Sequence, residues 1–273
     1  MDILATLIVV AVALGVGLYV VRPALVASRD AATRAVVAAA AVVTVVATAL
    51  PALRTVHPGE PAFAGEVDRP DDGVPVPEGF SGPVRLLVSG KLAERGEPVV
   101  TFTISGTHGP VEGRLERTFG YARVGRSGRA RVASDHDIDF FPARIDAGSR
   151  RLRLDRIQGQ LASPLRIAVY REPIPIAGGP WILAAIALAL AAVGDARLGL
   201  RENLSIAAGM ALAFGLLVTY NATPASAIGP AAGGVVLGAI VGSLAGWIAA
   251  AVARRIVPAA RRPPRARGGA TAA

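Results

Sequence analysis

The residues best suited to chemistry lie close together in the run 134–139, Ser-Asp-His-Asp-Ile-Asp. Its three acids stand at alternate positions and so share one face of a strand, and several carboxylate oxygens together can hold a hard cation such as calcium. Against this, Phe140 stands where a calcium-binding loop needs glycine for its sharp turn. We therefore interpret the run as the solvated end of a strand and keep cation binding as an alternative. The candidate metal ligands are Asp135, His136, Asp137 and Asp139.

Sequence signatures of catalysis do not accompany this run. The three histidines, His57, His108 and His136, are far apart, and none has the spacing of paired metal ligands. No Gly-x-Ser-x-Gly turn, which would expose a serine nucleophile, occurs in the chain. Cysteine is absent, which excludes disulfides and thiolate metal sites. The sequence therefore predicts a non-catalytic protein without a cofactor, and an envelope enzyme is the weaker alternative.

Two groups of arginines could make specific contacts. The guanidinium group binds phosphates and carboxylates through two parallel hydrogen bonds, so either group could meet lipid headgroups or an acidic partner. The plainer interpretation is a solvated face. The first group is Arg123, Arg126, Arg129 and Arg131, and the second is Arg150, Arg151, Arg153 and Arg156.

A row of glycines is the sharpest pattern in the chain. They recur every four residues near the C-terminus, and Ala250 extends the row. Small residues at this period let two helix backbones approach closely inside a membrane. The row could pack against another helix of the same chain, through Gly209, Ala213 or Gly215, or it could mediate self-association or docking on a partner. The helix-packing glycines are Gly234, Gly238, Gly242 and Gly246.

These features belong to a chain with five uncharged apolar segments. A bilayer core of about 30 Å needs about 17 to 25 helical residues, and each segment has that length or nearly so. The mean hydropathy of +0.49 and the 52% hydrophobic content exceed what a soluble core needs. The segments contain no Asp, Glu, Lys, Arg or His, which argues against an ion-coupled transporter. We predict transmembrane helices over residues 3–21, 35–53, 176–193, 204–220 and 231–252.

One polar insert separates the second segment from the third. Residues 54–83 are rich in proline, glycine and acids and predict an irregular lead-in. Residues 84–175 alternate apolar and polar positions between breaks at glycine or proline, which predicts an antiparallel β-sandwich, with a small barrel as the alternative. The expected strands are residues 84–89, 100–105, 111–121, 129–133, 138–141, 151–155 and 165–169.

The basic residues of the short loops predict the orientation. The loops after the first and third segments carry arginine, whereas residues 221–230 carry no charge and residues 254–273 form an arginine-rich tail. This distribution predicts a multi-pass protein of a bacterial inner membrane, with the N-terminus and the β domain outside the cytoplasm and the tail inside. The tail arginines, as topology anchors or alternatively as lipid contacts, are Arg254, Arg255, Arg261, Arg262, Arg265 and Arg267.

The charge of the insert limits its partners. Its basic and acidic residues nearly balance, so we expect no binding to nucleic acid or another polyanion. The expected partners are the lipid bilayer and either a second protein or another copy of the chain. We therefore predict a non-catalytic membrane protein whose β domain binds a partner or helps assemble an envelope complex. A channel or transporter subunit that oligomerises through the glycine-rich helix is an alternative.

Overall fold

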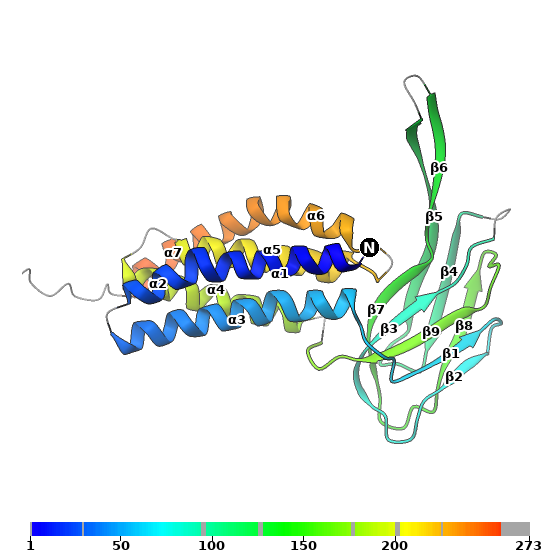
Figure 1. Ribbon diagram of the computed structural model, residues 1–273. Coiled ribbons are helices and arrows are strands. Elements are labelled where there is room, and N and C mark those ends of the chain that lie inside the picture. Colours follow the sequence, from blue (N-terminus) through cyan, green and yellow to red (C-terminus); the bar gives the residue numbers. More distant parts are fainter. Residues whose placement is uncertain are drawn as a thin grey trace, which may run out of the picture. The chain divides into compact units, whose positions relative to one another are not determined.

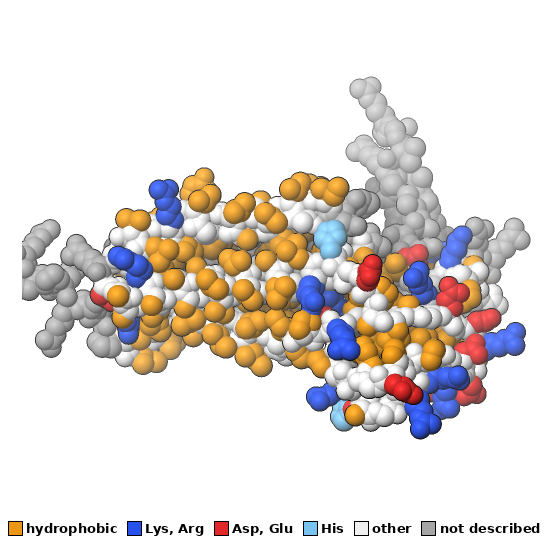
Figure 2. All heavy atoms as spheres, turned by 60° about the horizontal axis from the view of Figure 1, so that its bottom comes forward, with side chains coloured by type: hydrophobic (Ala, Val, Ile, Leu, Met, Phe, Trp, Pro, Cys, Tyr) orange, Lys and Arg blue, Asp and Glu red, His pale blue; other side chains and the backbone are white. Residues whose placement is uncertain are grey.

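The chain forms two compact units, which are described separately (Figure 1). The computed structural model describes residues 2–28, 30–93, 97–124, 128–175, 178–199, 203–224 and 226–257, without the side chains of residue 2 and residues 118–136. The β unit comprises Leu53–Pro180 and Asn221–Ala227. The helical unit comprises Ile3–Ala52, Trp181–Tyr220 and the described residues from Ile228 on. Figure 2 shows hydrophobic side chains over the visible face of the helical unit and charged side chains over the β unit.

Five helices in the described part of the chain are long and apolar enough to cross a membrane, which confirms the five predicted helices. The first and the fifth each contain a short π-helical turn, a feature often found at functional sites. The first helix consists of α1 (Asp2–Val16), η1 (Gly17–Val21) and α2 (Arg22–Ala27). The middle three are α3 (Ala31–Val56), α4 (Gly179–Leu198) and α5 (Asn203–Asn221). The fifth helix consists of α6 (Ile228–Leu237), η2 (Gly238–Gly242) and α7 (Ser243–Ile256).

The glycine row of the fifth helix lies against α5. A Cβ atom added at Gly242 would lie 2.5 Å from the Cα of Met210, and one at Gly246 would lie 2.6 Å from the Cα of Ile206. On the α5 side, Gly209 faces the Gly242 carbonyl just as closely. The two backbones therefore touch where side chains would otherwise stand, as small residues permit between membrane helices.

A buried carboxylate joins α4 to α5. Asp195 is 2% exposed and accepts hydrogen bonds from the backbone nitrogens of Leu204 and Ser205 and from the Ser205 hydroxyl, at 3.1, 2.8 and 2.6 Å. The first N–H groups of a helix have no partner within it, so an acceptor at this end stabilises the helix. The sequence prediction ended this apolar segment at residue 193, whereas α4 continues to Leu198 and includes Asp195. Its role in the fold is to cap α5.

The β unit contains two antiparallel sheets that pack on one core. The first sheet has the strand order β1-β9-β3-β7 and the second β2-β8-β4-β5-β6. Leu86 and Ile167 of the first sheet and Ile104 and Leu154 of the second are buried in that core. The strands are β1 (Phe63–Val67), β2 (Gly73–Pro75), β3 (Gly82–Ser89), β4 (Val99–Ser105), β5 (Val111–Val124), β6 (Gly128–His136), β7 (Ile138–Ile145), β8 (Arg151–Gln158) and β9 (Leu165–Arg171).

All seven strands expected from the alternation occur, as β3 to β9, but residues 54–83 differ from the prediction. They supply β1, which pairs with β9, and β2, which pairs with β8. Val67, Val74 and Phe80 from this stretch are buried in the shared core. Both strands stand at the edge of a sheet. Proline is tolerated there because the backbone N–H groups on the outer side of an edge strand have no neighbouring strand to bond. The stretch is therefore part of the β unit and not a lead-in to it.

A long two-stranded ribbon extends beyond the sheets (Figure 1). Beyond Leu115, β5 pairs with β6 in an unbroken register from Glu116 with His136 to Val124 with Gly128. β4 accompanies β5 as far as Glu116, and beyond Arg117 no third strand continues along β5 among the described strands. The ribbon therefore exposes backbone on both sides.

The close approach of the fifth helix to α5 can be tested with Gly242→Leu. The new side chain would collide with the backbone of Gly209 and Met210. We expect the free energy of unfolding of the full-length protein in micelles to fall by about 1–3 kcal/mol, the usual cost of overpacking, as measured by titration with a denaturing detergent. Gly233→Leu is the matched control, because a Cβ atom at Gly233 would meet nothing within 4 Å. Equal stability of the two variants would contradict the packing described.

Candidate functional site

The outer face of the first sheet carries a buried charge cluster centred on Arg85 of β3. The side chain of Arg85 is 2% exposed, and its Nε lies 3.1 Å from Oε2 of Glu172. Its Nη1 donates a hydrogen bond to the Thr55 hydroxyl at 2.7 Å, and its Nη2 donates to the backbone carbonyl of Arg54 at 2.9 Å. The guanidinium also lies 4.4 Å from the centre of the Phe140 ring. Arg85 therefore ties the last turn of α3 to the sheet, within the β unit.

The two charges of this cluster depend on each other. Burial raises the pKa of the Glu172 carboxyl above its ordinary value, although the charges of Arg85 and Arg54 oppose the rise. Burial likewise lowers the pKa of the Arg85 guanidinium, and the Glu172 charge opposes that fall. Taking two charges out of water costs several kcal/mol for each, and only a close partner offsets that cost. The cluster is therefore a structural clamp, and it commits this face of the sheet to contact with α3.

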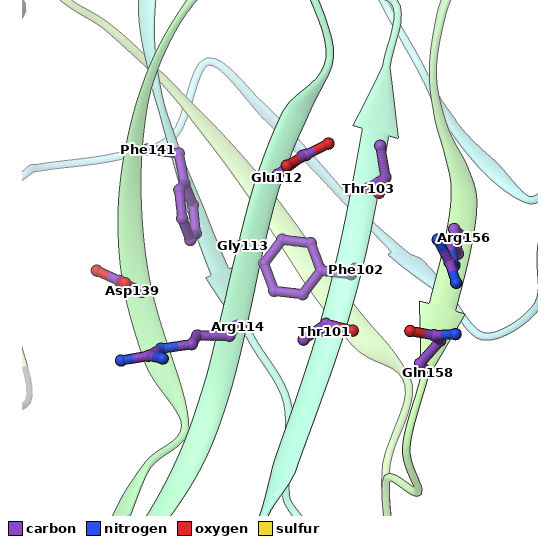
Figure 3. Close-up of a pocket in the computed structure, with 10 residues that line it drawn as sticks. All are labelled: Thr101, Phe102, Thr103, Glu112, Gly113, Arg114, Asp139, Phe141, Arg156 and Gln158. Carbon is purple, nitrogen blue, oxygen red and sulfur yellow. The ribbon is translucent and has the colours of Figure 1, made fainter.

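The outer face of the second sheet is open, and it holds a shallow hollow of about 440 Å³, which we name the sheet trough (Figure 3). Side chains from β8, β4 and β5 stand in two rows across it. The strand register places Arg156 opposite Thr103 and Thr103 opposite Glu112 in one row. In the other row, Gln158 stands opposite Thr101 and Thr101 opposite Arg114. The trough is lined by Thr101, Phe102, Thr103, Glu112, Gly113, Arg114, Asp139, Phe141, Arg156 and Gln158.

A β-bulge in β8 places two of these side chains on the open face. The register of β4 with β8 shifts between Thr103 and Ile104, and Asp155 is the extra residue. Leu152 and Leu154 are buried before the bulge, whereas Arg156 and Gln158 are exposed after it. Asp155 accepts a hydrogen bond from the Ser105 hydroxyl at 2.8 Å, which holds the bulge in place. Bulges re-aim side chains in this way beside many binding sites.

A glycine lets two aromatic rings fill the space beneath the trough. Phe102 and Phe141 pack edge to face with ring centres 5.5 Å apart. A Cβ atom at Gly113 would lie 2.5 Å from Cζ of Phe141 and would collide with Phe102 as well. The rings therefore occupy the place of a side chain at position 113. This packing supports β5 beside β7 (Figure 3).

The charges of the trough balance, and part of its hydrogen-bonding capacity is unused. Two cations, Arg114 and Arg156, and two acids, Glu112 and Asp139, line the hollow. The Nε of Arg114 lies 3.4 Å from a carboxylate oxygen of Glu116. In the part of the chain that the structure describes, neither Arg156 nor Gln158 has a hydrogen bond or an ion pair through its side chain. The trough thus offers donors and acceptors of both signs and is suited to binding.

The acidic run is divided between two places. Asp137 lies between β6 and β7, and Asp139 on β7 lines the sheet trough. The side chains of Asp135 and His136 lie outside the described residues. Among the residues whose side chains are described, no group of three histidines or acids could hold a metal ion.

The structure describes the arginines of the second group but not the side chains of the first. Of the second group, Arg153 has carboxylate partners in Asp155 and Asp71, at 3.2 and 3.8 Å, whereas Arg156 reaches the trough. Arg254 and Arg255 lie in the last turn of α7. The arginines beyond the described side chains or residues are Arg123, Arg126, Arg129, Arg131, Arg261, Arg262, Arg265 and Arg267.

Comparison with family models, with curated proteins and with solved structures finds no match for this chain. Its function must therefore be argued from the site. Sequence patterns had singled out Arg156 and Asp139 separately, and the alternation had placed Thr101 and Thr103 on the polar face of their strand. The sequence feature that could have shown that these residues share one site is the extra residue in β8. It breaks the apolar–polar alternation after Leu154.

The mutual dependence of the clamp charges can be tested with Arg85→Met. The substitution removes the nearest cation from buried Glu172 and leaves it the partly exposed Arg54, 3.7 Å away, so we expect the free energy of unfolding to fall by about 3 kcal/mol at neutral pH. Without the Arg85 charge, the pKa of Glu172 rises further above its unfolded value, so the variant should regain stability as the pH falls. Urea titration of the full-length protein in micelles at several pH values measures both effects.

The matched control for this test is Arg166→Met, because Arg166 is exposed on β9. Its effect should stay within about 0.5 kcal/mol, as is usual for surface sites. Adding Glu172→Gln to Arg85→Met should recover most of the loss, because it removes the stranded carboxylate. A double variant as unstable as Arg85→Met alone would contradict the clamp.

Proposed function

We propose that this protein is a non-catalytic multi-pass membrane protein whose β domain binds a protein partner through the sheet trough and helps assemble an envelope complex. The observation that carries the proposal is the pair Arg156 and Gln158, which a bulge turns to the open face and which lack side-chain partners among the described residues. The opposite sheet face carries the clamp to α3. One face of the β unit is thus used within the fold, and the other supports contact with a partner.

The form of the trough supports a protein partner over a small molecule. Pockets for small molecules are concave, mostly apolar and enclose most of the ligand surface. The trough is open rather than enclosed, and charged side chains of both signs line it beside Phe102 and Phe141. Protein interfaces have a polar rim with many direct hydrogen bonds, and arginine is enriched in them. A partner surface with a carboxylate for Arg156 and a cation for Glu112 would complement it.

The proposal includes an orientation in the inner membrane of a bacterial cell. Short loops rich in arginine remain in the cytoplasm, and long domains cross largely regardless of charge. Arg22 and Arg34 flank the connection after the first helix, and Arg197 lies in the last turn of α4. With five crossings, the N-terminus and the β domain would then lie outside and the arginine-rich tail inside. The charge pattern supports this orientation.

An oligomeric channel built on the glycine row is less well supported. The glycines that would form its seam already lie against α5 of the same chain. A second copy could use them only by displacing α5, which is the most buried of the five helices. The proposed function therefore rests on the β unit.

The binding role can be tested by placing a photo-crosslinking amino acid at Thr101 of the full-length protein in its native membrane. We expect a discrete protein adduct there and none from the same amino acid at Ala64, an exposed position on β1. Arg156→Glu should reduce the Thr101 adduct by about tenfold, as expected for an arginine contact of about 1.4 kcal/mol. Gel mobility and mass spectrometry of the adducts measure the outcome.

Arg166→Glu is the matched control, since it makes the same charge change at an exposed arginine of the other sheet. It should leave the Thr101 adduct unchanged. Absence of any adduct at Thr101, or equal losses for Arg156→Glu and Arg166→Glu, would contradict a role for the trough.

The orientation can be tested with reporter fusions. A phosphatase that is active only outside the cytoplasm should be active when inserted at Gly109, in the exposed turn between β4 and β5. The same enzyme fused after Arg267 should be inactive, because the tail arginines hold that end in the cytoplasm. Cellular phosphatase activity normalised to protein level measures both fusions. The reverse pattern would overturn the proposed orientation.

A further inference from the structure

An apolar groove of about 270 Å³ lies in the helical unit, between the first helix, α5 and the fifth helix. Val12 and Gly15 line it from the first helix, Ala207 from α5 and Ala239 from the fifth helix. Every other residue that lines it is hydrophobic as well. The groove is therefore unsuited to an ion or a polar solute, because neither would find a hydrogen-bonding side chain there.

Small residues hold this groove open. A Cβ atom at Gly15 would meet nothing within 4 Å, and Ala207 and Ala239 contribute only methyl groups. The fifth helix cannot move towards the first to fill the space, because Gly238 and Gly242 hold its backbone against α5. The gap is thus a consequence of the glycine row.

Both π-helical turns of the structure border the groove. Val20 lies in η1 and Ala239 in η2, and both residues line it. A π-helical turn adds one residue to a helix and redirects the side chains that follow, and such turns are found mostly at functional sites. Two helices that are distant in the sequence therefore depart from α-helical geometry at the same cavity.

We propose that this groove binds one acyl chain of a membrane lipid. Its walls are apolar, and Met210 and Val235 on its border are 37% and 46% exposed, so the groove is open to the surface of the helical unit. That surface is apolar around it, with Leu14, Val236 and Ile240 exposed. A lipid chain can therefore enter sideways from the bilayer without crossing a polar surface.

The size of the groove favours a chain over a helix. The wall that the first helix forms extends over eight residues, from Val12 to Val20. At 1.5 Å per residue this is a length of about 12 Å. A transmembrane helix with its side chains is about 10–12 Å wide and would need a contact strip along the whole span. The groove is short, and its volume of about 270 Å³ has room for a hydrocarbon chain but not for a helix of that width.

The bound chain would have a structural role beside the first helix. This helix is the least buried of the five, with 11% of its membrane-spanning window buried against 56% for α5. Packing in a membrane depends on dispersion contacts, which an empty gap cannot provide. An acyl chain in the groove supplies those contacts between the first helix and α5. The inference is independent of the sheet trough and of its partner.

The proposal can be tested by photolabelling. The full-length protein is reconstituted into phosphatidylcholine vesicles containing a phospholipid with a diazirine in mid-chain, irradiated, digested and analysed by mass spectrometry. We expect label at Met210 and Val235 to exceed label at Ile182 and Ile186, exposed apolar residues of α4, by roughly threefold or more, because a held chain keeps its contacts longer.

Gly15→Leu fills the groove and should reduce the label at Met210 and Val235 by roughly threefold or more, because the leucine takes the contacts of the chain. Gly233→Leu is the matched control and should leave the label unchanged, since position 233 is exposed with open space around it. Ala207→Leu fills the groove from the opposite wall and provides the same test if Gly15→Leu does not fold.

Two outcomes would overturn the proposal. One is equal label in the groove and on α4, and the other is groove label that persists in folded Gly15→Leu and Ala207→Leu.

Discussion

The buried pair of Arg85 and Glu172 is the constraint on which the arrangement of the β unit depends. Burial disfavours both charges, as the opposite directions of their pKa shifts show, and each reduces the cost of the other. The geometry that brings them together also requires the Thr55 hydroxyl and the Arg54 carbonyl at the end of α3. The last turn of α3 is therefore bound to the outer face of one sheet. The other sheet is left to meet the surroundings, and this is where the sheet trough lies.

Alternating polarity was enough to predict strands β3 to β9, and all of them except β6, whose side chains are not described, contribute apolar residues to the shared core. It failed for β1 and β2, which lie in residues 54–83, a stretch where prolines and acids outnumber the few apolar residues that reach the core. It also missed the trough, because the bulge at Asp155 breaks the period after Leu154. Arg85 stood at a polar position of its strand in the sequence. Its burial depends on a helix end thirty residues away, and no local pattern contains that information.

For the helices, too, local sequence patterns predicted the elements but not the contacts between them. Apolar length predicted five helices, and the glycine spacing identified the face of the fifth that packs closely. The spacing left three residues as possible contacts, and the structure places Gly209 against Gly242, whereas Gly215 lies against Thr48 of α3. Neither π-helical turn could be predicted, because an extra residue in a uniformly apolar helix leaves no mark in the composition. The acyl-chain groove results from the glycine row and the π-helical turns together. The glycines fix the position of the fifth helix, and the turns lie in two of the helices that line the groove.

The central claim is that the clamp covers the part of the first sheet around Arg85, whereas the outer face of the second sheet stays open. The chain contains no cysteine, so single cysteines report on each face without interference. The decisive measurement is the rate at which a maleimide labels Thr101→Cys and Ala168→Cys in the full-length protein in micelles. The account predicts fast labelling at Thr101, which is exposed, and labelling of Ala168, which is 4% exposed, only through local opening that Arg85→Met accelerates. Equal rates at the two positions, or a rate at Ala168 that Arg85→Met leaves unchanged, would contradict it.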